Sequence, residues 1–172
     1  MPRCRECAGR RIAFASARAA VAYVGAAPAL VRAWKEHGLR PFADIAADLV
    51  AETVPRPAAD VITYIPPDGD RSLRRGHHPA ESLARRLAAR WDLEPMPLLR
   101  RKRIVARQTG LHLADRRRNV RGAFASVSRA PVAVVLVDDV YTTGATAAAA
   151  STALRTAGAR RVQIVTFARA VR

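Results

Sequence analysis

The sequence is poor in aromatic residues and holds only two cysteines and two lysines among its 172 residues. Two cysteines cannot form the disulfide framework that stabilises small secreted domains, so a packed hydrophobic core has to hold this chain together. No apolar run reaches the roughly 20 residues that a membrane span needs. The longest candidate, residues 19–31, contains Gly25 and Pro28, and Arg18 interrupts the apolar stretch that would have to serve as a signal peptide. These absences predict a cytoplasmic protein without a membrane span.

Acidic residues are also scarce, because 14 Asp and Glu stand against 30 Lys and Arg, which gives a formal net charge of +16. Nearly all the positive charges are arginines, since Lys35 and Lys102 are the only lysines. Such an excess favours polyanionic partners, namely phosphorylated small molecules, nucleic acid or an anionic membrane. A genome biased toward Arg and Ala explains the same composition, so charge alone leaves the partner open.

Two common nucleotide-binding motifs are missing. The sequence contains neither the G-x-x-x-x-G-K-[ST] loop of nucleotide triphosphatases nor the G-x-G-x-x-G fingerprint of dinucleotide-binding domains. These two classes of protein are therefore excluded.

The hydrophobic pattern alternates between strands and helices, which predicts an α/β fold with a parallel sheet flanked by helices on both faces. The first part of the chain contains expected helices, one of which has Ile45 among the apolar side chains on one face. These helices predict a small N-terminal helical cap. We expect three units: a Cys-x-x-Cys segment at 1–11, the cap at 12–57 and the core at 58–172. The expected strands are 20–25, 59–66, 94–101, 130–139 and 160–170, and the expected helices are 27–38, 40–54, 79–91 and 144–158.

The stretch "VVLVDDVYTTGAT", residues 134–146, is the most informative part of the sequence. Asp138 and Asp139 come at the expected end of a buried strand, and ligands of open parallel sheets bind beyond the carboxyl ends of the strands. Gly144 allows a tight turn, and the helix that follows offers free N–H groups to a phosphate. Adjacent carboxylates would repel a bare phosphate but suit vicinal hydroxyls. The stretch therefore predicts a site for a ribose that carries a 5′-phosphate.

This stretch resembles the phosphoribosyl pyrophosphate signature of type I phosphoribosyltransferases. Across nearly the whole chain, further motifs resemble the ComF-type competence family within that group. They are "CREC" at 4–7, "WKEHG" at 34–38, "IP" at 65–66, "RRG" at 74–76 and "RQTGL" at 107–111. The resemblance implies a type I phosphoribosyltransferase-like fold and a Mg²⁺-dependent transfer of phosphoribose, in which pyrophosphate is displaced at the anomeric carbon.

The resemblance also implies a role for each matched residue. Asp138 and Asp139 would be the catalytic pair and would hold the ribose hydroxyls, directly or through Mg²⁺. Ribose 5-phosphate would be bound by the two aspartates together with Thr142, Thr143, Gly144, Ala145 and Thr146, of which the last five would hold its 5′-phosphate. Pyrophosphate would be bound by Ile65, Pro66, Pro67, Asp68 and Arg75. A mobile loop within residues 100–124 would close over the reaction through Arg107, Gln108, Arg116 and Asn119.

Three departures from the family pattern bear on the expected acceptor, on the role of residues 77–79 and on zinc binding. Purine-salvage relatives carry a carboxylate where this chain has Thr142, which argues against salvage of hypoxanthine or guanine. His77, His78 and Pro79 stand where relatives commonly have an aromatic residue, Asn and Gln. Cys4 and Cys7 are the candidate zinc ligands, but they form one Cys-x-x-Cys pair where the family often has a four-cysteine zinc ribbon, so a zinc site would lack half of its ligands.

Two functions stay open at this point. The chain is either a phosphoribosyltransferase with an unidentified acceptor, or a non-catalytic protein of the same fold that binds single-stranded DNA and the competence machinery during DNA uptake. A DNA-binding protein would lose affinity steeply as the salt concentration rises. The expected small-molecule partner is phosphoribosyl pyrophosphate with Mg²⁺, and the acceptor is not named by the sequence.

Overall fold

The computed structural model describes residues 12–39, 41–67, 77–102 and 122–170. In chain order the elements are β1(Ser16–Ala22), α1(Ala27–His37), α2(Phe42–Thr53), β2(Val61–Tyr64), α4(Pro79–Trp91), β3(Glu94–Pro95), β4(Leu99–Arg101), β5(Phe124–Ser126), β6(Ala133–Tyr141), α6(Ala145–Thr156) and β7(Arg161–Arg169).

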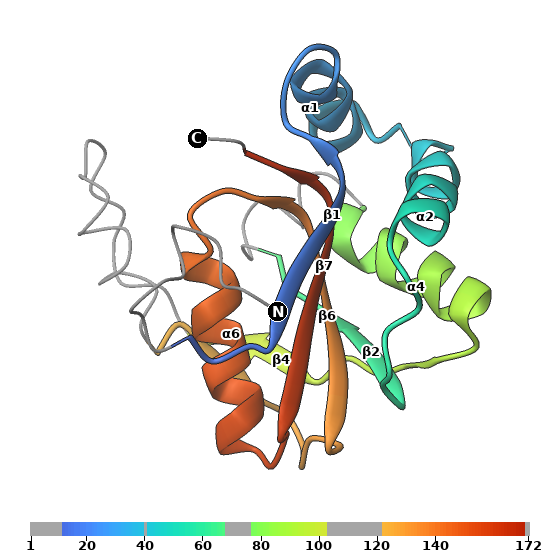
Figure 1. The fold of residues 1–172 in the computed structure, drawn as a ribbon. Coiled ribbons are helices and arrows are strands. Elements are labelled where there is room, and N and C mark those ends of the chain that lie inside the picture. Colours follow the sequence, from blue (N-terminus) through green and yellow to red (C-terminus); the bar gives the residue numbers. More distant parts are fainter. Residues whose placement is uncertain (1–11, 40, 68–76, 103–121, 171–172) are drawn as a thin grey trace.

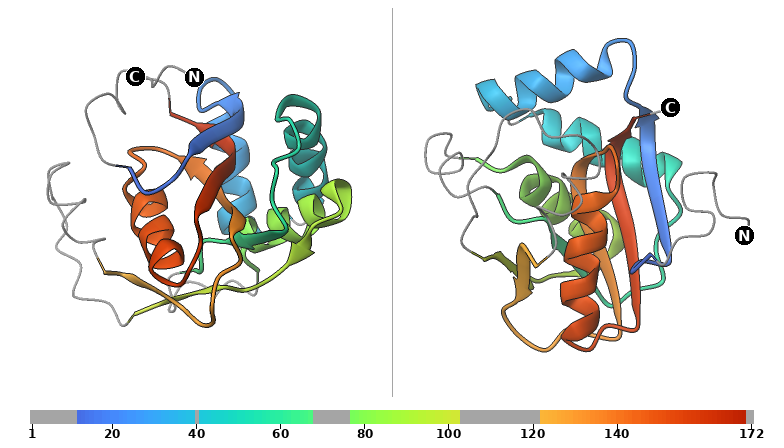
Figure 2. Two further views of the ribbon diagram at one scale, coloured as in Figure 1. Left: turned by 60° about the horizontal axis from the view of Figure 1, so that its bottom comes forward. Right: turned by 90° about the vertical axis from the view of Figure 1, so that its left-hand side faces the viewer.

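Five strands form one parallel sheet in the order β1-β7-β6-β2-β3, and β4 pairs with β5 in a separate antiparallel ribbon. Helices α2 and α4 cover one face of the sheet and α6 covers the other (Figures 1 and 2). Residues 134–137 of the central strand β6 are fully buried, as expected for a strand with helices on both sides. The predicted α/β class with a helix-flanked parallel sheet is therefore confirmed.

Helix α4 shows why the sequence begins and ends its helices where it does. The His78 side chain accepts a hydrogen bond from the Glu81 N–H group at the N-cap, and Pro79 stands in the first turn, where its missing N–H group costs nothing. Leu83 and Leu87 lie on the buried face, and Asp92 ends the helix in the left-handed conformation. This helix was predicted with the same bounds.

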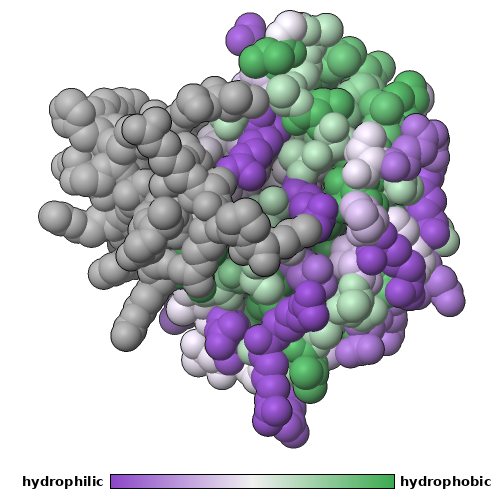
Figure 3. All heavy atoms as spheres, viewed as in Figure 1, coloured by the Kyte–Doolittle hydropathy of each residue, from purple (hydrophilic) through white to green (hydrophobic). Residues whose placement is uncertain are grey.

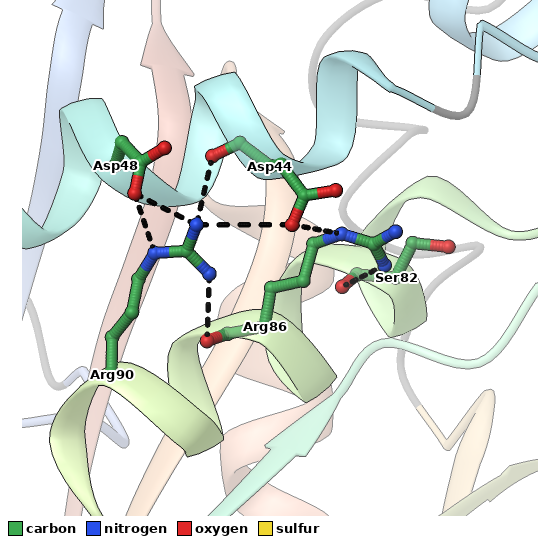
Figure 4. A network of polar contacts seen from close by, with 5 residues as sticks. All are labelled: Asp44, Asp48, Ser82, Arg86 and Arg90. Atoms are coloured by element: carbon green, nitrogen blue, oxygen red, sulfur yellow. Dashed lines mark hydrogen bonds and ion pairs between the residues drawn. The ribbon is translucent and has the colours of Figure 1, made fainter.

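Helices α2 and α4 pack through small side chains and are joined at the surface by a charged network. Arg86 Nε lies 2.8 Å from Asp44 Oδ1, and Arg90 Nε donates to Asp48 Oδ1 over 2.7 Å (Figure 4). The hydrogen bond from Arg90 lowers the pKa of Asp48. Because the two aspartates are more than half exposed, the network adds little stability.

Three expectations about the elements are wrong. Ile45 is 54% exposed, because α2 buries the stripe of Phe42, Ala43, Ala46, Ala47 and Val50 instead. The single strand expected at 94–101 is divided between β3 and β4, which belong to different sheets, because prolines at 95 and 97 interrupt it. Strand β6 runs on to Tyr141, so the two aspartates lie inside the strand rather than at its end.

The N-terminal segment is built into the core. Strand β1 is the parallel neighbour of β7, and an aromatic cluster joins α1 and α2 to the same strand. Ring centroids are 5.3 Å apart for Trp34 and Phe42, and 5.2 Å apart for Phe42 and Phe167. The predicted units 12–57 and 58–172 thus share one hydrophobic core across their described residues.

Helix α1 forms the predicted N-terminal helical cap at the carboxyl edge of the sheet (Figure 1). It packs inward through Val31 and Trp34, while Val24, Leu30 and Leu39 stay exposed on or beside it. Hydrophobic residues are visible over this part of the surface in Figure 3. No helix among the described residues has the length and apolar character required to cross a membrane.

Candidate functional site

The paired aspartates lie near the carboxyl end of β6, between β2 and β7. Asp138 Oδ1 accepts a hydrogen bond from the Asp139 N–H group over 2.9 Å, and Asp139 Oδ1 accepts one from the Val140 N–H group over 2.7 Å. Each carboxyl group is thus oriented through one oxygen, which leaves the other oxygen for further contacts.

Lys35 of the cap helix contacts one of these remaining oxygens. Its Nζ lies 2.5 Å from Asp139 Oδ2, and the aspartate side chain is only 12% exposed. A charge this well buried needs a partner, and the lysine neutralises it. The cap helix therefore reaches into the carboxylate site, a contact between residues 104 positions apart in the chain that no local sequence pattern indicates.

The Asp138 carboxyl group has a raised pKa. Although Asp138 keeps some exposed surface, removal of its carboxyl group from water and then the negative charge of Asp139 raise the pKa of Asp138 to about 8. At neutral pH the Asp138 carboxyl group therefore holds a proton, and Asp139 forms the ion pair with Lys35.

This pKa predicts how stability changes with pH. Because the folded state holds the Asp138 proton more tightly than the unfolded chain, whose carboxyl group has an ordinary value near 3.8, the stabilisation is present at acid pH and is lost as pH rises through about 8. We expect the urea midpoint of the wild type to fall relative to that of Asp138→Asn between pH 5 and pH 8.5. Parallel curves for the two proteins would contradict the raised pKa.

The turn after β6 has the geometry of a phosphate-binding loop. Gly144 adopts φ 70° immediately before α6, and no side chain caps that helix at this residue. Thr143 Oγ1 accepts a hydrogen bond from the Ala145 N–H group over 3.3 Å, so this hydroxyl holds the turn. Thr142 is exposed, and Ala145 and Thr146 lie in the first turn of α6. The five residues predicted to bind the 5′-phosphate therefore form one continuous loop and helix start.

The Tyr141 side chain packs against this loop. A Cβ atom added to Gly144 would lie 2.7 Å from Tyr141 Cζ, so the turn passes directly over the tyrosine ring. The Arg169 guanidinium stacks 5.0 Å from the ring centroid, and Phe14 contacts the ring edge-on with centroids 6.4 Å apart. The position of Gly144 thus depends on packing as well as on its backbone conformation.

The loop after β2, where a pyrophosphate site is predicted, lies beside the strand that carries the aspartates. The Ile65 N–H group donates to the Val137 carbonyl over 2.9 Å, and Ile65 and Pro66 are buried while Pro67 is partly exposed. Arg101 Nε donates to the Pro66 carbonyl over 3.0 Å, and its guanidinium lies 4.9 Å from the centre of the Phe124 ring. Arg101 was expected only as part of a basic loop, and its reach to this site was missed.

His77 and His78 also approach the site, although the sequence offered no function for them. His77 Nε2 lies 2.6 Å from the Trp34 carbonyl, which connects the start of α4 to the cap helix. Several other predicted residues fall outside the described ranges: Asp68, Arg75, Arg107, Gln108, Arg116, Asn119, Cys4 and Cys7.

The side chains of this site suit Mg²⁺ better than a metal that needs a complete set of protein ligands. No cluster of three or more His, Cys, Asp or Glu side chains occurs among the described residues. Mg²⁺ is commonly bound through one or two carboxylates plus substrate phosphates, with water completing its coordination. Asp138 and Asp139 beside a phosphate loop fit this pattern, whereas zinc at Cys4 and Cys7 stays a prediction.

Comparisons with known proteins include a sequence relative and solved structures with a similar fold. No family model matches the chain. The chain is 36% identical over 105 residues to "Competence protein F" of Haemophilus influenzae, a match that covers 58% of this chain and 46% of that protein. This chain therefore aligns with about half the length of its curated relative.

Both solved structures are larger enzymes, and the match covers 74% of this chain and 25% of theirs. One is the glutamine phosphoribosylpyrophosphate amidotransferase from B. subtilis, with 26% identity and a TM-score of 0.47. The other is the allosteric regulatory enzyme of purine biosynthesis, with 24% identity and a TM-score of 0.49. These scores are too low to carry an argument about this site. The sequence match, in contrast, confirms the predicted resemblance: this chain is similar in sequence to Competence protein F.

Proposed function

We propose that the chain binds phosphoribosyl pyrophosphate with Mg²⁺ and transfers its phosphoribosyl group to an acceptor. The observation that carries the proposal is the continuous unit formed by Asp138, Asp139 and the turn at Gly144. A pair of oriented carboxyl groups suits a diol, and the uncapped start of α6 a few residues later suits a phosphate. The diol and the phosphate lie at opposite ends of ribose 5-phosphate.

Each part of the site has a task in this reaction. Asp139 and Asp138 accept hydrogen bonds from the two ribose hydroxyls, and the loop from Thr142 to Thr146 holds the 5′-phosphate. The loop at Pro66, with Arg101 behind it, faces the pyrophosphate. The bond from the anomeric carbon to pyrophosphate breaks with its electron pair on the leaving oxygen, and the acceptor supplies the pair for the new bond. When bound, Mg²⁺ neutralises charge on the departing pyrophosphate.

Lys35 determines the charge of the site before a ligand binds. Before ligand arrives, its ammonium group neutralises Asp139. A ligand that brings Mg²⁺ to the carboxylates brings its own positive charge and has to displace this ammonium group or share the aspartate with it. Binding is therefore expected to be coupled to the position of the cap helix.

Calorimetry tests the proposal directly. We expect phosphoribosyl pyrophosphate to bind in the presence of Mg²⁺ and to raise the stability of the fold by about 2.7 kcal/mol at a free concentration 100 times its dissociation constant. Release of pyrophosphate, measured across a panel of nucleobases, then identifies the acceptor. The absence of both a heat of binding and a thermal stabilisation at millimolar ligand would exclude this function.

A second function is favoured by the charge of +16 and by the competence protein among the relatives. In it, the same fold binds single-stranded DNA through its arginines without catalysis. Titration with an oligodeoxythymidylate at increasing salt separates the two, because binding through many phosphate contacts falls steeply with salt. Strong salt-dependent DNA binding together with no response to phosphoribosyl pyrophosphate would favour the second function.

A further inference from the structure

His78 occupies a fixed position at the start of α4. Its Nδ1 accepts a hydrogen bond from the Glu81 N–H group over 3.2 Å, which makes this nitrogen the acceptor of the imidazole ring. In a neutral imidazole the other nitrogen then carries the proton. The helix cap therefore sets the tautomer and leaves Nε2 as an N–H donor.

The ring lies beside the end of the strand that leads into the loop assigned to pyrophosphate. Its centroid lies 5.8 Å from that of Tyr64, the last residue of β2, directly before the loop at Ile65–Pro67. The same loop is contacted by Arg101, whose Nε donates to the Pro66 carbonyl. The imidazole is therefore held next to the segment in which we place the pyrophosphate.

The imidazole is neutral near pH 7. Burial is the main cause that lowers the pKa of His78, and Arg101 and His77 act in the same direction, while Glu81 and Asp139 act against it. A neutral ring keeps the Nδ1 acceptor that the helix cap requires. It also keeps the single donor on Nε2.

This donor has no hydrogen-bond partner among the residues that the structure describes. In contrast, the Nε2 atom of the neighbouring His77 lies 2.6 Å from a backbone carbonyl. His78 is partly exposed, so solvent or a ligand can reach the ring. A fixed, accessible donor beside a loop that faces an anion is suited to bind that anion.

We propose that His78 donates its Nε2–H to a diphosphate oxygen of the ligand and so distinguishes phosphoribosyl pyrophosphate from ribose 5-phosphate. The proposal rests on the proposed function, because it assigns the anion that the loop after β2 receives. The 5′-phosphate is bound at the other side of β6, at the start of α6, so the histidine contributes to only one of the two phosphate subsites. A neutral donor also adds no net charge to be neutralised when pyrophosphate leaves.

Two variants separate the ligand contact from the helix cap. Ser and Asn cap helices well, so His78→Ser and His78→Asn are expected to keep the thermal midpoint within a few degrees of the wild type, whereas His78→Ala loses the cap. With Mg²⁺ present, we expect both capped variants to bind pyrophosphate and phosphoribosyl pyrophosphate about tenfold more weakly or worse, the usual loss for a hydrogen bond to a charged group. Their affinity for ribose 5-phosphate should not change.

The three ligands make each outcome decisive. Equal losses for ribose 5-phosphate and pyrophosphate would show that His78 acts only through the structure, and unchanged binding of both would show that it acts on neither; either result overturns the proposal. If the wild type itself binds neither ribose 5-phosphate nor phosphoribosyl pyrophosphate, the proposed function fails first. A ¹⁵N spectrum of the imidazole gives a further readout: the Nε2–H tautomer should be present, and its signal should shift with pyrophosphate but not with ribose 5-phosphate.

Discussion

Replacement of both site carboxyl groups, Asp138→Asn with Asp139→Asn, is expected to weaken the binding of phosphoribosyl pyrophosphate with Mg²⁺ by about 100-fold to 10,000-fold. A hydrogen bond from a ribose hydroxyl contributes roughly 1.5–3 kcal/mol at a charged carboxylate and about 0.5–1.5 kcal/mol at a neutral carboxyl group. The amide oxygens that replace them are weaker acceptors and also poor ligands for Mg²⁺. Calorimetry on the wild type and the double variant measures the difference.

The fold should survive this replacement at neutral pH. Asp138 already holds a proton there, so Asn resembles it in charge, and Lys35 can turn toward solvent because its side chain is 38% exposed. Asp44→Asn with Asp48→Asn is the matched control, since it removes two carboxylates from the α2–α4 surface network away from the site. Equal binding by the wild type and the site variant would remove the carboxyl pair from the mechanism.

Gly144→Ala is the second replacement for which we expect a large effect. A left-handed backbone costs a residue with a Cβ atom about 1–2 kcal/mol, and forcing that atom into the Tyr141 ring adds about 1–3 kcal/mol. We expect a loss of about 2–5 kcal/mol in the free energy of unfolding. The displaced turn should also lower the affinity for ribose 5-phosphate.

Gly25→Ala is the control for the backbone contribution alone. Gly25 has φ 59°, close to that of Gly144, but no other atom lies within 4 Å of its added Cβ. Urea denaturation of the two variants isolates the contact with Tyr141 as their difference. The assigned role of Gly144 would be wrong if its variant were no less stable than that of Gly25 and bound ribose 5-phosphate normally.

The sequence predicted the parts of the site that are local in the chain. Asp138, Asp139 and the turn at Gly144 follow one another within seven residues, and strand, turn and helix are each determined by nearby side chains. Lys35, Arg101 and His78 were missed as members of the site because the strand order β7-β6-β2 and the packing of α1 bring them together. The hydrophobic periodicity of the sequence carries no information about such contacts.

The wrong expectations have a similar origin. The hydrophobic stripe of α2 was placed on its largest side chains, including Ile45, but close packing against α4 and β1 selects the alanine face. The change of character near Pro55 and Pro57 indicated a boundary between units, whereas the chain crosses from one part of a shared core to another. Side-chain size and proline spacing describe local structure and do not show which distant segment will cover it.

The pairing of β1 with β7 has a consequence for how the chain folds. Ser16 is aligned with Gln163, and Phe167 completes the aromatic cluster of Trp34 and Phe42. During synthesis, the first strand and the first two helices therefore emerge long before the strand against which they pack. Contacts so distant in sequence slow the search for the native topology, and until β7 leaves the ribosome these early segments expose apolar surface that a chaperone could recognise.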